Sequence, residues 1–401
     1  MRVSSFVPAD EPFFREWGAR RAGARRSLAR AGEFAARLGL DVDGVPAPLT
    51  VVGSKGKGTA ATYASAVLAA KGLRVGTITS PGYRTNRERI RVNGQAIGVA
   101  DYGALSAAVA AALPETDAAA DGGYLSPTGL FTLAGVWWLV TAAGCDALVL
   151  EAGIGGGSDE VSLFTPRTVA ITRIFDEHLG ILGDTVYEIA EEKAAVVTPG
   201  TRLVWTIPQD DQVAAHLRRA MPRSARFQTC ASYPGFVAPP GLSGMNAVLG
   251  INAAAGHAPG APGARRLDSV LDTIRLPGRL STHRRGDQTW VVDSAIDPVA
   301  VRAARDWSGG PSSVVVAFPD GKRPAPCLAE LAGCLVRPVA TENPRLAFTD
   351  PAWDRWRPLP VFADLDLDAL GPRVLALGTI SFVGEVLDRL DVPTEQTFHL
   401  P

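Results

Sequence analysis

The sequence predicts an α/β protein with two domains, the first built on a mostly parallel sheet and the second smaller. Short apolar segments of strand length alternate with helical segments along most of the 401 residues. Such alternation is typical of a parallel sheet with helices on both faces. The length itself suits two or three domains, at roughly 100–200 residues per domain, each able to bury its own core.

The first helical segment expected is residues 12–39, where apolar residues recur at spacings of three and four with arginines between them. An arginine-rich face of this kind is either solvated or phosphate-binding, and the solvated face is the commoner case. Buried strands are then expected where short apolar runs occur: 49–52, 74–79, 147–150, 168–172 and 202–206.

The apolar run 131–150 is long enough to raise the question of a membrane span. Gly144, Cys145 and Asp146 interrupt it, and a Gly-rich turn follows. An apolar helix followed by a strand over 147–150 explains the run better, because turn residues of this kind separate elements of a buried α/β unit. We therefore expect no membrane partner.

The second half of the chain contains two Pro/Gly-rich segments, 233–244 and 257–263, with a helix between them. New strands are expected after LPGRL (276–280). They fall at 289–292, 313–317, 334–339 and 373–377. This distribution predicts a first domain over 1–283 and a second over 284–401.

Composition and charge exclude several classes of protein. The formal net charge of -1 argues against a nucleic-acid-coating protein, which would need clustered cations. The four cysteines form no CxxC pair, which argues against a disulfide framework or a zinc site. The N-terminal residues lack the basic region and apolar run of a signal peptide. A cytoplasmic monomer is the expectation.

Lysine is scarce. Of the 40 basic residues only five are lysines, and the others are arginines. Nucleotide bias explains most of the arginines, but it makes the remaining lysines informative because guanidinium cannot perform some lysine chemistry. The lysines are Lys55, Lys57, Lys71, Lys193 and Lys322.

The segment GSKGKGT (53–59) follows a predicted strand and precedes a predicted Ala-rich helix. Glycines let backbone N–H groups close around phosphate oxygens, and a helix N-terminus adds positive potential. Lys57 would reach the β- and γ-phosphates, and Thr59 would offer a hydroxyl to Mg²⁺. Gly58 separates the two, so the strict phosphate-loop pattern is not met. A flexible Gly/Lys turn is the alternative, but the strand–loop–helix context favours phosphate binding.

Several motifs together resemble the folylpolyglutamate synthases and dihydrofolate synthases of the Mur ligase superfamily. They occur in the family's order along nearly the whole chain, at 52–59, TSPGYRTNRERIRVNGQAI (79–97), LVLEAGIGGGSD (148–159), EHLGILGDT (177–185), EIAEEKAAVVTPG (188–200), LPGRL (276–280), VVDSAIDP (291–298) and GTISFVGEV (378–386). The resemblance implies a P-loop, Mur-ligase-like ATPase domain followed by a smaller Rossmann-like domain. It also implies ADP-forming amide synthesis from a small carboxylic acid and an amino acid.

The resemblance assigns metal ligands and catalytic residues. Glu151 and Ser80 match residues that share a magnesium ion, and His178 matches a ligand of a second one. Lys193 matches a lysine that CO₂ carbamylates into an oxygen ligand, a reaction open to an amine but not to a guanidinium. The implied catalytic residues are Lys57, Glu151, His178 and Lys193. The implied metal ligands are Thr59, Ser80, Glu151, His178 and Lys193, with ATP and two Mg²⁺ ions as cofactors.

Each of these residues also has a structural interpretation. Glu151 could emerge into solvent at the end of its strand, although a carboxylate buried there is costly unless it meets a cation. A lone histidine such as His178 is usually structural or solvated. Lys193 follows two glutamates and could be a paired surface lysine.

The resemblance also assigns the nucleotide contacts. Asn252 matches an asparagine near the adenine, Arg279 a phosphate-contacting arginine and Asp293 a ribose-contacting aspartate. The His-Gln pair usual before the asparagine is absent, and the family's Asp-Gly-Ala-His-Asn-Pro is replaced by DSAIDP (293–298). The implied nucleotide-binding residues are Gly56, Lys57, Gly58, Thr59, Asn252, Arg279 and Asp293.

Departures concentrate where the acid substrate would lie. Thr128-Gly129 replaces the family's Phe-Glu, and GGGSDEVS (155–162) replaces Gly-Gly-Arg-Leu-Asp-Ala-Thr-Asn. Residues 319–326 lack an Asp-Lys-Asp run near the amino-acid pocket. The phosphate and metal positions match while the pocket differs, so we expect a ligase acting on a non-folate acid. The alternatives are a folate or pteroate ligase that adds glutamate, and a nucleotide-binding regulator or pseudoenzyme without turnover.

Overall fold

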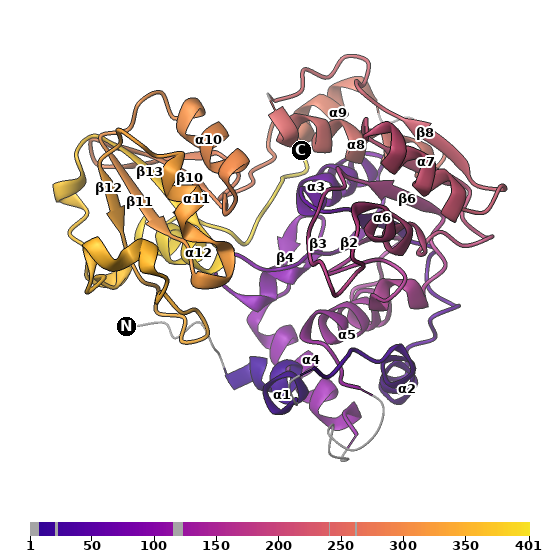
Figure 1. Cartoon of the computed structure of the whole chain (residues 1–401). Coiled ribbons are helices and arrows are strands. Elements are labelled where there is room, and N and C mark those ends of the chain that lie inside the picture. Colours follow the sequence, from indigo (N-terminus) through magenta and orange to yellow (C-terminus); the bar gives the residue numbers. More distant parts are fainter. Residues whose placement is uncertain (1–7, 21–22, 115–122, 240, 261–262) are drawn as a thin grey trace. The chain divides into compact units, whose positions relative to one another are not determined.

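The computed structural model describes residues 8–20, 23–114, 123–239, 241–260 and 263–401 (Figure 1). Its contacts divide the chain into two compact units. The first unit comprises Met1–Ser80, Arg87–Ile274 and Glu395–Pro401, and the second comprises Pro81–Asn86 and Arg275–Thr394. Each unit has its own sheet, as expected for two α/β domains.

The first unit contains an eight-stranded sheet in the order β4-β3-β2-β5-β1-β6-β7-β8. From β2 to β8 all neighbouring strands are parallel, whereas β3 and β4 form an antiparallel edge. Its strands are β1 (Leu49–Val52), β2 (Val75–Ile78), β3 (Ile90–Val92), β4 (Gln95–Ala96), β5 (Ala147–Glu151), β6 (Thr168–Ile171), β7 (Leu203–Thr206) and β8 (Arg226–Thr229). The central strands β1, β5 and β6 are buried along their whole length, which explains their continuous apolar runs.

The helices of the first unit are α1 (Glu11–Ala19), α2 (Leu28–Leu38), α3 (Lys57–Ala70), α4 (Val99–Ala112), α5 (Pro127–Thr141), α6 (Val186–Ala194), α7 (Asp211–Ala220), α8 (Gly241–His257) and α9 (Ala264–Leu271). Helices α3 and α8 lie side by side (Figure 1). A Cβ atom at Gly250 of α8 would lie 2.2 Å from the carbonyl oxygen of Ala60, so the small residues of both helices allow this close packing.

The apolar run 131–150 divides as expected, into the C-terminal part of α5 and strand β5. Among the described residues no helix is long and apolar enough to cross a membrane.

The single helix predicted over 12–39 is wrong: the structure has two helices, α1 and α2, and the described residues between them are not helical. Gly23 adopts a positive φ of 81°, and the Ser27 hydroxyl caps α2 by accepting from the N–H of Arg30. Both features stop a continuous helix. As a result, Arg26 lies outside the helices.

The second unit contains a five-stranded sheet in the order β12-β11-β13-β10-β9, in which only β9 is antiparallel. Apolar residues pack on both faces of this sheet. Its elements are β9 (Ser281–Arg285), β10 (Gln288–Asp293), α10 (Pro298–Trp307), β11 (Ser313–Ala317), α11 (Pro324–Ala329), β12 (Val336–Pro338), β13 (Arg373–Gly378) and α12 (Ile380–Arg389). The predicted α/β class with two sheets is therefore confirmed.

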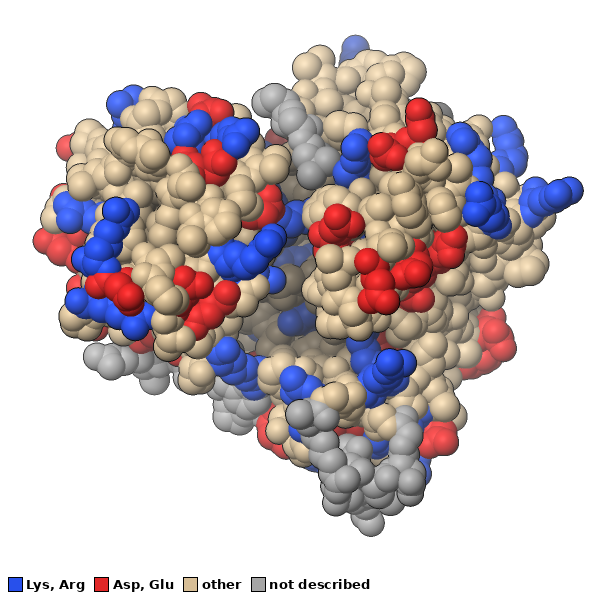
Figure 2. Space-filling view, viewed as in Figure 1, with Lys and Arg blue, Asp and Glu red and all other residues tan. Residues whose placement is uncertain are grey.

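On the face shown in Figure 2, acidic and basic side chains are interspersed on each unit. This distribution agrees with the near-zero net charge of the chain.

Candidate active site

The glycine-rich loop connects β1 to α3 and requires glycine at two positions. Gly53 has a φ of 132°, and a Cβ atom there would lie 2.0 Å from the Thr172 hydroxyl oxygen. Gly56 caps α3 with a φ of 85°, and its Cβ atom would lie 1.8 Å from Asn246 Nδ2. The loop therefore packs closely against Thr172 and Asn246 and leads directly into the first turn of α3. The first backbone N–H groups of a helix form an anion-binding site.

Two lysines converge on one carbonyl oxygen of this loop. Lys57 Nζ and Lys193 Nζ each donate to the Gly53 carbonyl oxygen at 3.0 Å. The Lys193 side chain is only 1% exposed, and it also forms an ion pair with Glu177 at 2.9 Å. Burial, followed by the charge of Lys57, lowers the pKa of Lys193. The structure thus brings together two predicted site residues that are far apart in sequence.

Glu151 and Ser80 are also brought together. Glu151 ends β5, is 5% exposed, and accepts a hydrogen bond from the Ser80 N–H at 2.9 Å. A Cβ atom at Gly58 would lie 3.4 Å from Glu151 Oε2, so this carboxylate lies against the first turn of α3. The Ser80 hydroxyl accepts from Arg89 Nη1 at 2.7 Å. Thr59, in the same turn of α3, is 3% exposed.

These residues fit a magnesium ion that takes part of its coordination from phosphates. Among the described residues, no group of three or more His, Cys, Asp and Glu side chains is arranged to hold a metal. Mg²⁺ is commonly held by one or two carboxylates together with substrate phosphates. A single buried carboxylate beside an anion-binding helix terminus is consistent with that chemistry.

His178 lies on the segment between β6 and α6, where it is exposed and has a positive φ of 50°. Its carbonyl oxygen accepts from the N–H groups of Ile181 and Leu182. The preceding residue, Glu177, is the one that contacts Lys193.

Helix α8 contains Asn252, the predicted adenine contact, and a second asparagine, Asn246, that lies against the glycine-rich loop. The Asn252 amide donates to the carbonyl oxygens of Ser232 and Val248 at 3.1 and 2.9 Å. Asn246, 1% exposed, lies against Gly56, and its Oδ1 has no hydrogen-bond partner among the described residues. Asn246 was missed because only the packing of α8 on α3 reveals its position.

The two nucleotide-binding candidates of the second unit lie together. The Leu280 N–H donates to Asp293 Oδ2 at 2.7 Å, and Arg279 Nη1 donates to the Ser294 hydroxyl. The turn containing Arg279 is thus fixed to the end of β10.

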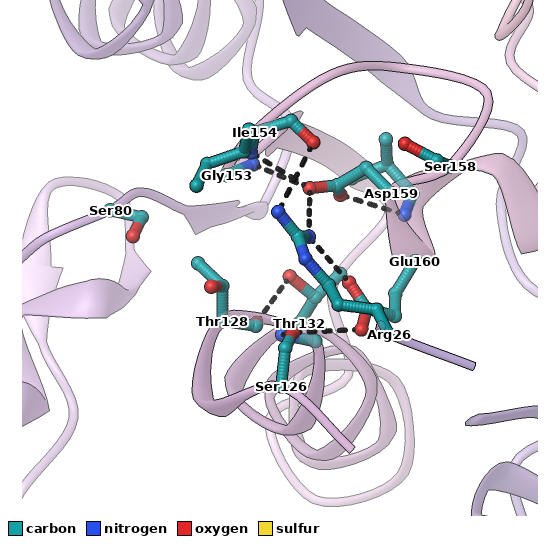
Figure 3. A network of polar contacts seen from close by, with 12 residues as sticks. Arg26, Ser80, Ser126, Thr128, Thr132, Gly153, Ile154, Ser158, Asp159 and Glu160 are labelled. Carbon is teal, nitrogen blue, oxygen red and sulfur yellow. Dashed lines mark hydrogen bonds and ion pairs between the residues drawn. The ribbon is translucent and has the colours of Figure 1, made fainter. Parts of the chain in front are cut away.

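A third cluster fixes the turn that follows Glu151 (Figure 3). Asp159 Oδ2 accepts from the N–H groups of Gly153 and Ile154 at 2.9 and 3.0 Å. Arg26 Nη1 lies 3.3 Å from Asp159 and 3.4 Å from Glu160, and Arg26 Nη2 donates to the Ile154 carbonyl oxygen. We call Arg26, Asp159 and Glu160 the Arg26 cluster.

Glu160 is a deeply buried acid of this cluster that the sequence did not reveal as special. It is 1% exposed and accepts a hydrogen bond from the Ser126 hydroxyl at 2.8 Å. Burial, followed by the charge of Asp159, raises the pKa of Glu160 to about 7. The adjacent acids Asp159 and Glu160 in a Gly-rich segment were a sequence signal for this cluster. No residue near Arg26 or Ser126 in the sequence indicated that these two side chains would contact the acids.

Comparison with models of known protein families gave no match. Curated proteins similar in sequence include a probable bifunctional folylpolyglutamate synthase/dihydropteroate synthase of Halobacterium salinarum, 36% identical over 197 residues, which are 49% of this chain and 24% of that protein. A dihydrofolate synthase/folylpolyglutamate synthase of Bacillus subtilis is 32% identical over 219 residues, 54% of this chain and 50% of that protein. The chain thus spans half or less of the length of these relatives.

Solved structures share the fold over nearly the whole chain. A folylpolyglutamate synthase in complex with AMPPCP and folate has a TM-score of 0.75 at 21% identity, covering 96% of this chain and 100% of that one. A bifunctional folylpolyglutamate synthase/dihydrofolate synthase with Mn, AMPPNP and L-glutamate bound has a TM-score of 0.75 at 22% identity, covering 98% and 100%. The chain is thus similar in sequence to folylpolyglutamate and dihydrofolate synthases over about half of its length, and it shares the fold of such enzymes over nearly all of it.

Proposed function

We propose that the chain is an ATP-dependent, ADP-forming ligase that activates a carboxylic acid as an acyl phosphate and couples it to an amine, an amino acid in the reaction we favour. The observation that carries this proposal is the position of Lys57 at the start of α3, where its ammonium group donates to the Gly53 carbonyl oxygen and the buried Glu151 carboxylate lies against the same turn of the helix. An ammonium group at a helix N-terminus adds to the positive potential there, which suits a triphosphate.

The reaction has two displacement steps. A carboxylate oxygen of the acid attacks the γ-phosphorus, the bond to the β-bridging oxygen breaks, and ADP leaves. The amine then attacks the acyl carbon, loses a proton, and expels inorganic phosphate. Both steps need charge neutralisation and alignment more than acid–base chemistry. Lys57 would bind the β- and γ-phosphates, and the N–H groups of Gly58 and Thr59 would orient them.

Magnesium, which neutralises the triphosphate when bound, would be held by Thr59, Ser80 and Glu151, and a second ion by His178 and Lys193. Asn252, Arg279 and Asp293 are the proposed contacts to the adenine, phosphate and ribose. One similar structure has manganese and AMPPNP bound, which supports a nucleotide and a divalent cation as the ligands of this site.

We further propose that Lys193 is carbamylated in the active enzyme. CO₂ reacts with a neutral amine, forming an N–C bond and releasing a proton. The lowered pKa of Lys193 favours the neutral amine. The product is an anion, so Glu177, which contacts the amine at 2.9 Å, would then face a like charge unless a cation binds between them. Carbamylation and metal binding should therefore be linked.

We favour a non-folate acid because Thr128 and Gly129 provide neither the aromatic ring nor the carboxylate of the family pattern. A folate or pteroate ligase that adds L-glutamate is the alternative, favoured by the folate and the L-glutamate bound in similar structures. A nucleotide-binding regulator without turnover is the third candidate.

A substrate panel separates the three. ADP release is measured with dihydropteroate, reduced folates and unrelated carboxylic acids, each with several amino acids, and with either substrate omitted. We expect ADP only when an acid and an amine are both present. Strong turnover of dihydropteroate with glutamate would favour the folate ligase over our choice. ATP binding without ADP release for every pair would favour the regulator.

A further inference from the structure

The Glu160 carboxyl group occupies the space that a side chain at position 129 would need. A Cβ atom at position 129 would lie 2.0 Å from the Glu160 carboxyl carbon and 2.1 Å from its Oε1. The Gly129 N–H instead donates to the Ser126 hydroxyl, which in turn donates to Glu160. Glycine at position 129 is therefore needed to leave room for the buried Glu160 side chain.

The carboxyl group of Glu160 belongs to a network that ends beside Glu151. Glu160 and Asp159 both contact Arg26, and Arg26 and Asp159 together bind three backbone groups of the turn 153–154. This turn begins two residues after Glu151. A shift of the turn would move the end of β5 and with it the Glu151 carboxylate.

Arg26 can reach this turn only because of the break between α1 and α2. The backbone of this connection is fixed to the segment before α5, since the Ser27 and Tyr124 N–H groups donate to the Tyr124 and Arg25 carbonyl oxygens. The Arg26 side chain is 17% exposed, and the carboxylates it faces are 2% exposed. A buried pair of carboxylates needs this counter-charge.

Positions 129 and 160 are therefore coupled. The Glu160 carboxyl group fills the space that a side chain at 129 would need, and the guanidinium that pairs with it comes from residue 26.

We propose that Arg26 and Glu160 are positioning residues for Glu151, and that glycine at position 129 is what admits the Glu160 carboxylate to this position. The inference rests on the proposed function, because the orientation of Glu151 matters only if metal and nucleotide bind beside it. Neither residue is proposed to touch the nucleotide.

The test measures AMPPCP binding to the full chain by calorimetry, with and without Mn²⁺. In E160A and R26M we expect the Mn²⁺-dependent gain in affinity to fall about tenfold, the lower range for residues that orient a metal ligand. Affinity without Mn²⁺ should not change. R15M is the matched control, since Arg15 forms an exposed ion pair with Glu11 and should behave as the unchanged protein.

The coupled change is tested by the double variant. G129E alone should unfold at a lower urea concentration because its side chain meets Glu160, and E160A alone because Arg26 loses a partner. G129E/E160A should regain the stability that G129E loses, since the side chain at 129 then enters the space that Glu160 leaves. A double variant no more stable than the sum of the single changes predicts would overturn this coupling.

The outcomes separate the two proposals. If the unchanged protein binds Mn²⁺–AMPPCP and R26M and E160A bind it equally well, the positioning role is wrong while the proposed function stands. If the unchanged protein binds no Mn²⁺–AMPPCP, the proposed function fails, and the positioning role fails with it.

Discussion

The glycine-rich loop and the Arg26 cluster lie at the ends of the neighbouring strands β1 and β5, yet their charges are arranged in opposite ways. At the loop, the Lys57 ammonium group donates to the Gly53 and Ser54 carbonyl oxygens, whereas the neighbouring Lys193 is paired with Glu177. In the Arg26 cluster, one guanidinium serves two buried carboxylates and two backbone N–H groups are already bound. The first arrangement has cationic charge to offer an anion, whereas the second is satisfied internally. The first therefore suits ligand binding and the second suits positioning.

The largest effect is expected from Lys57→Ala. Removing the charge nearest the phosphates should lower ADP release by on the order of 100-fold or more, as for other groups that stabilise transition-state charge. Thermal unfolding should change little, since Lys57 is not part of the apolar core. Near-normal turnover in this variant would mean that the active site lies elsewhere.

Lys193→Arg tests the chemistry of the second lysine. Arginine keeps the positive charge but cannot be carbamylated, so turnover should fall on the order of 100-fold and added bicarbonate should not restore it. Lys322→Arg, at an exposed position, is the control and should retain activity. An active Lys193→Arg enzyme would exclude the carbamate.

Gly56→Ala tests the shape of the loop. Its Cβ atom would meet Asn246 Nδ2 at 1.8 Å, and its φ of 85° is unfavourable for alanine. We expect weaker AMPPCP binding and a loss of stability. Gly72→Ala is the matched control, because Gly72 has a φ of 91° and open space around it. It should lose only the roughly 1–2 kcal/mol of backbone strain. Equal effects in both variants would argue against the close contact with Asn246.

The smallest effect is a pH dependence of stability from Glu160. Its pKa is raised from 4.5 to about 7 by folding, so the native state binds more protons between these values. The stabilising contribution is complete below pH 4.5 and is lost as the pH rises through about 7. Glu160→Gln should flatten this part of the stability profile, measured by urea unfolding from pH 5 to 8. An unchanged profile would show that Glu160 does not titrate in this range.

The same contrast explains what the sequence could predict. The central strands and the glycine-rich loop are encoded by neighbouring residues: a short, mostly apolar run predicts a buried strand, and GSKGKGT contains its own glycines and lysines. Strands β3, β4, β8 and β9, at the margins of the two sheets, were missed because they are short and contain polar residues or arginines.

The Arg26 cluster and Asn246 depend on tertiary packing, which one sequence does not reveal. The predicted continuous helix would contain Arg26, and only the break before Ser27 frees this residue to reach Asp159. Lys71, for which the sequence predicts no role, donates to the Ala254, Ala255 and Ala258 carbonyl oxygens at the end of α8. Its role is to cap that helix.

The acyl phosphate is tested most directly by following oxygen atoms. The acid that supports turnover is labelled with ¹⁸O in its carboxylate, and the released phosphate is examined by mass spectrometry. An acyl phosphate predicts one ¹⁸O atom in each phosphate, because the attacking carboxylate oxygen leaves with phosphorus when the amine displaces it. Unlabelled phosphate, released at the same rate as amide is formed, would contradict the proposed ligase mechanism.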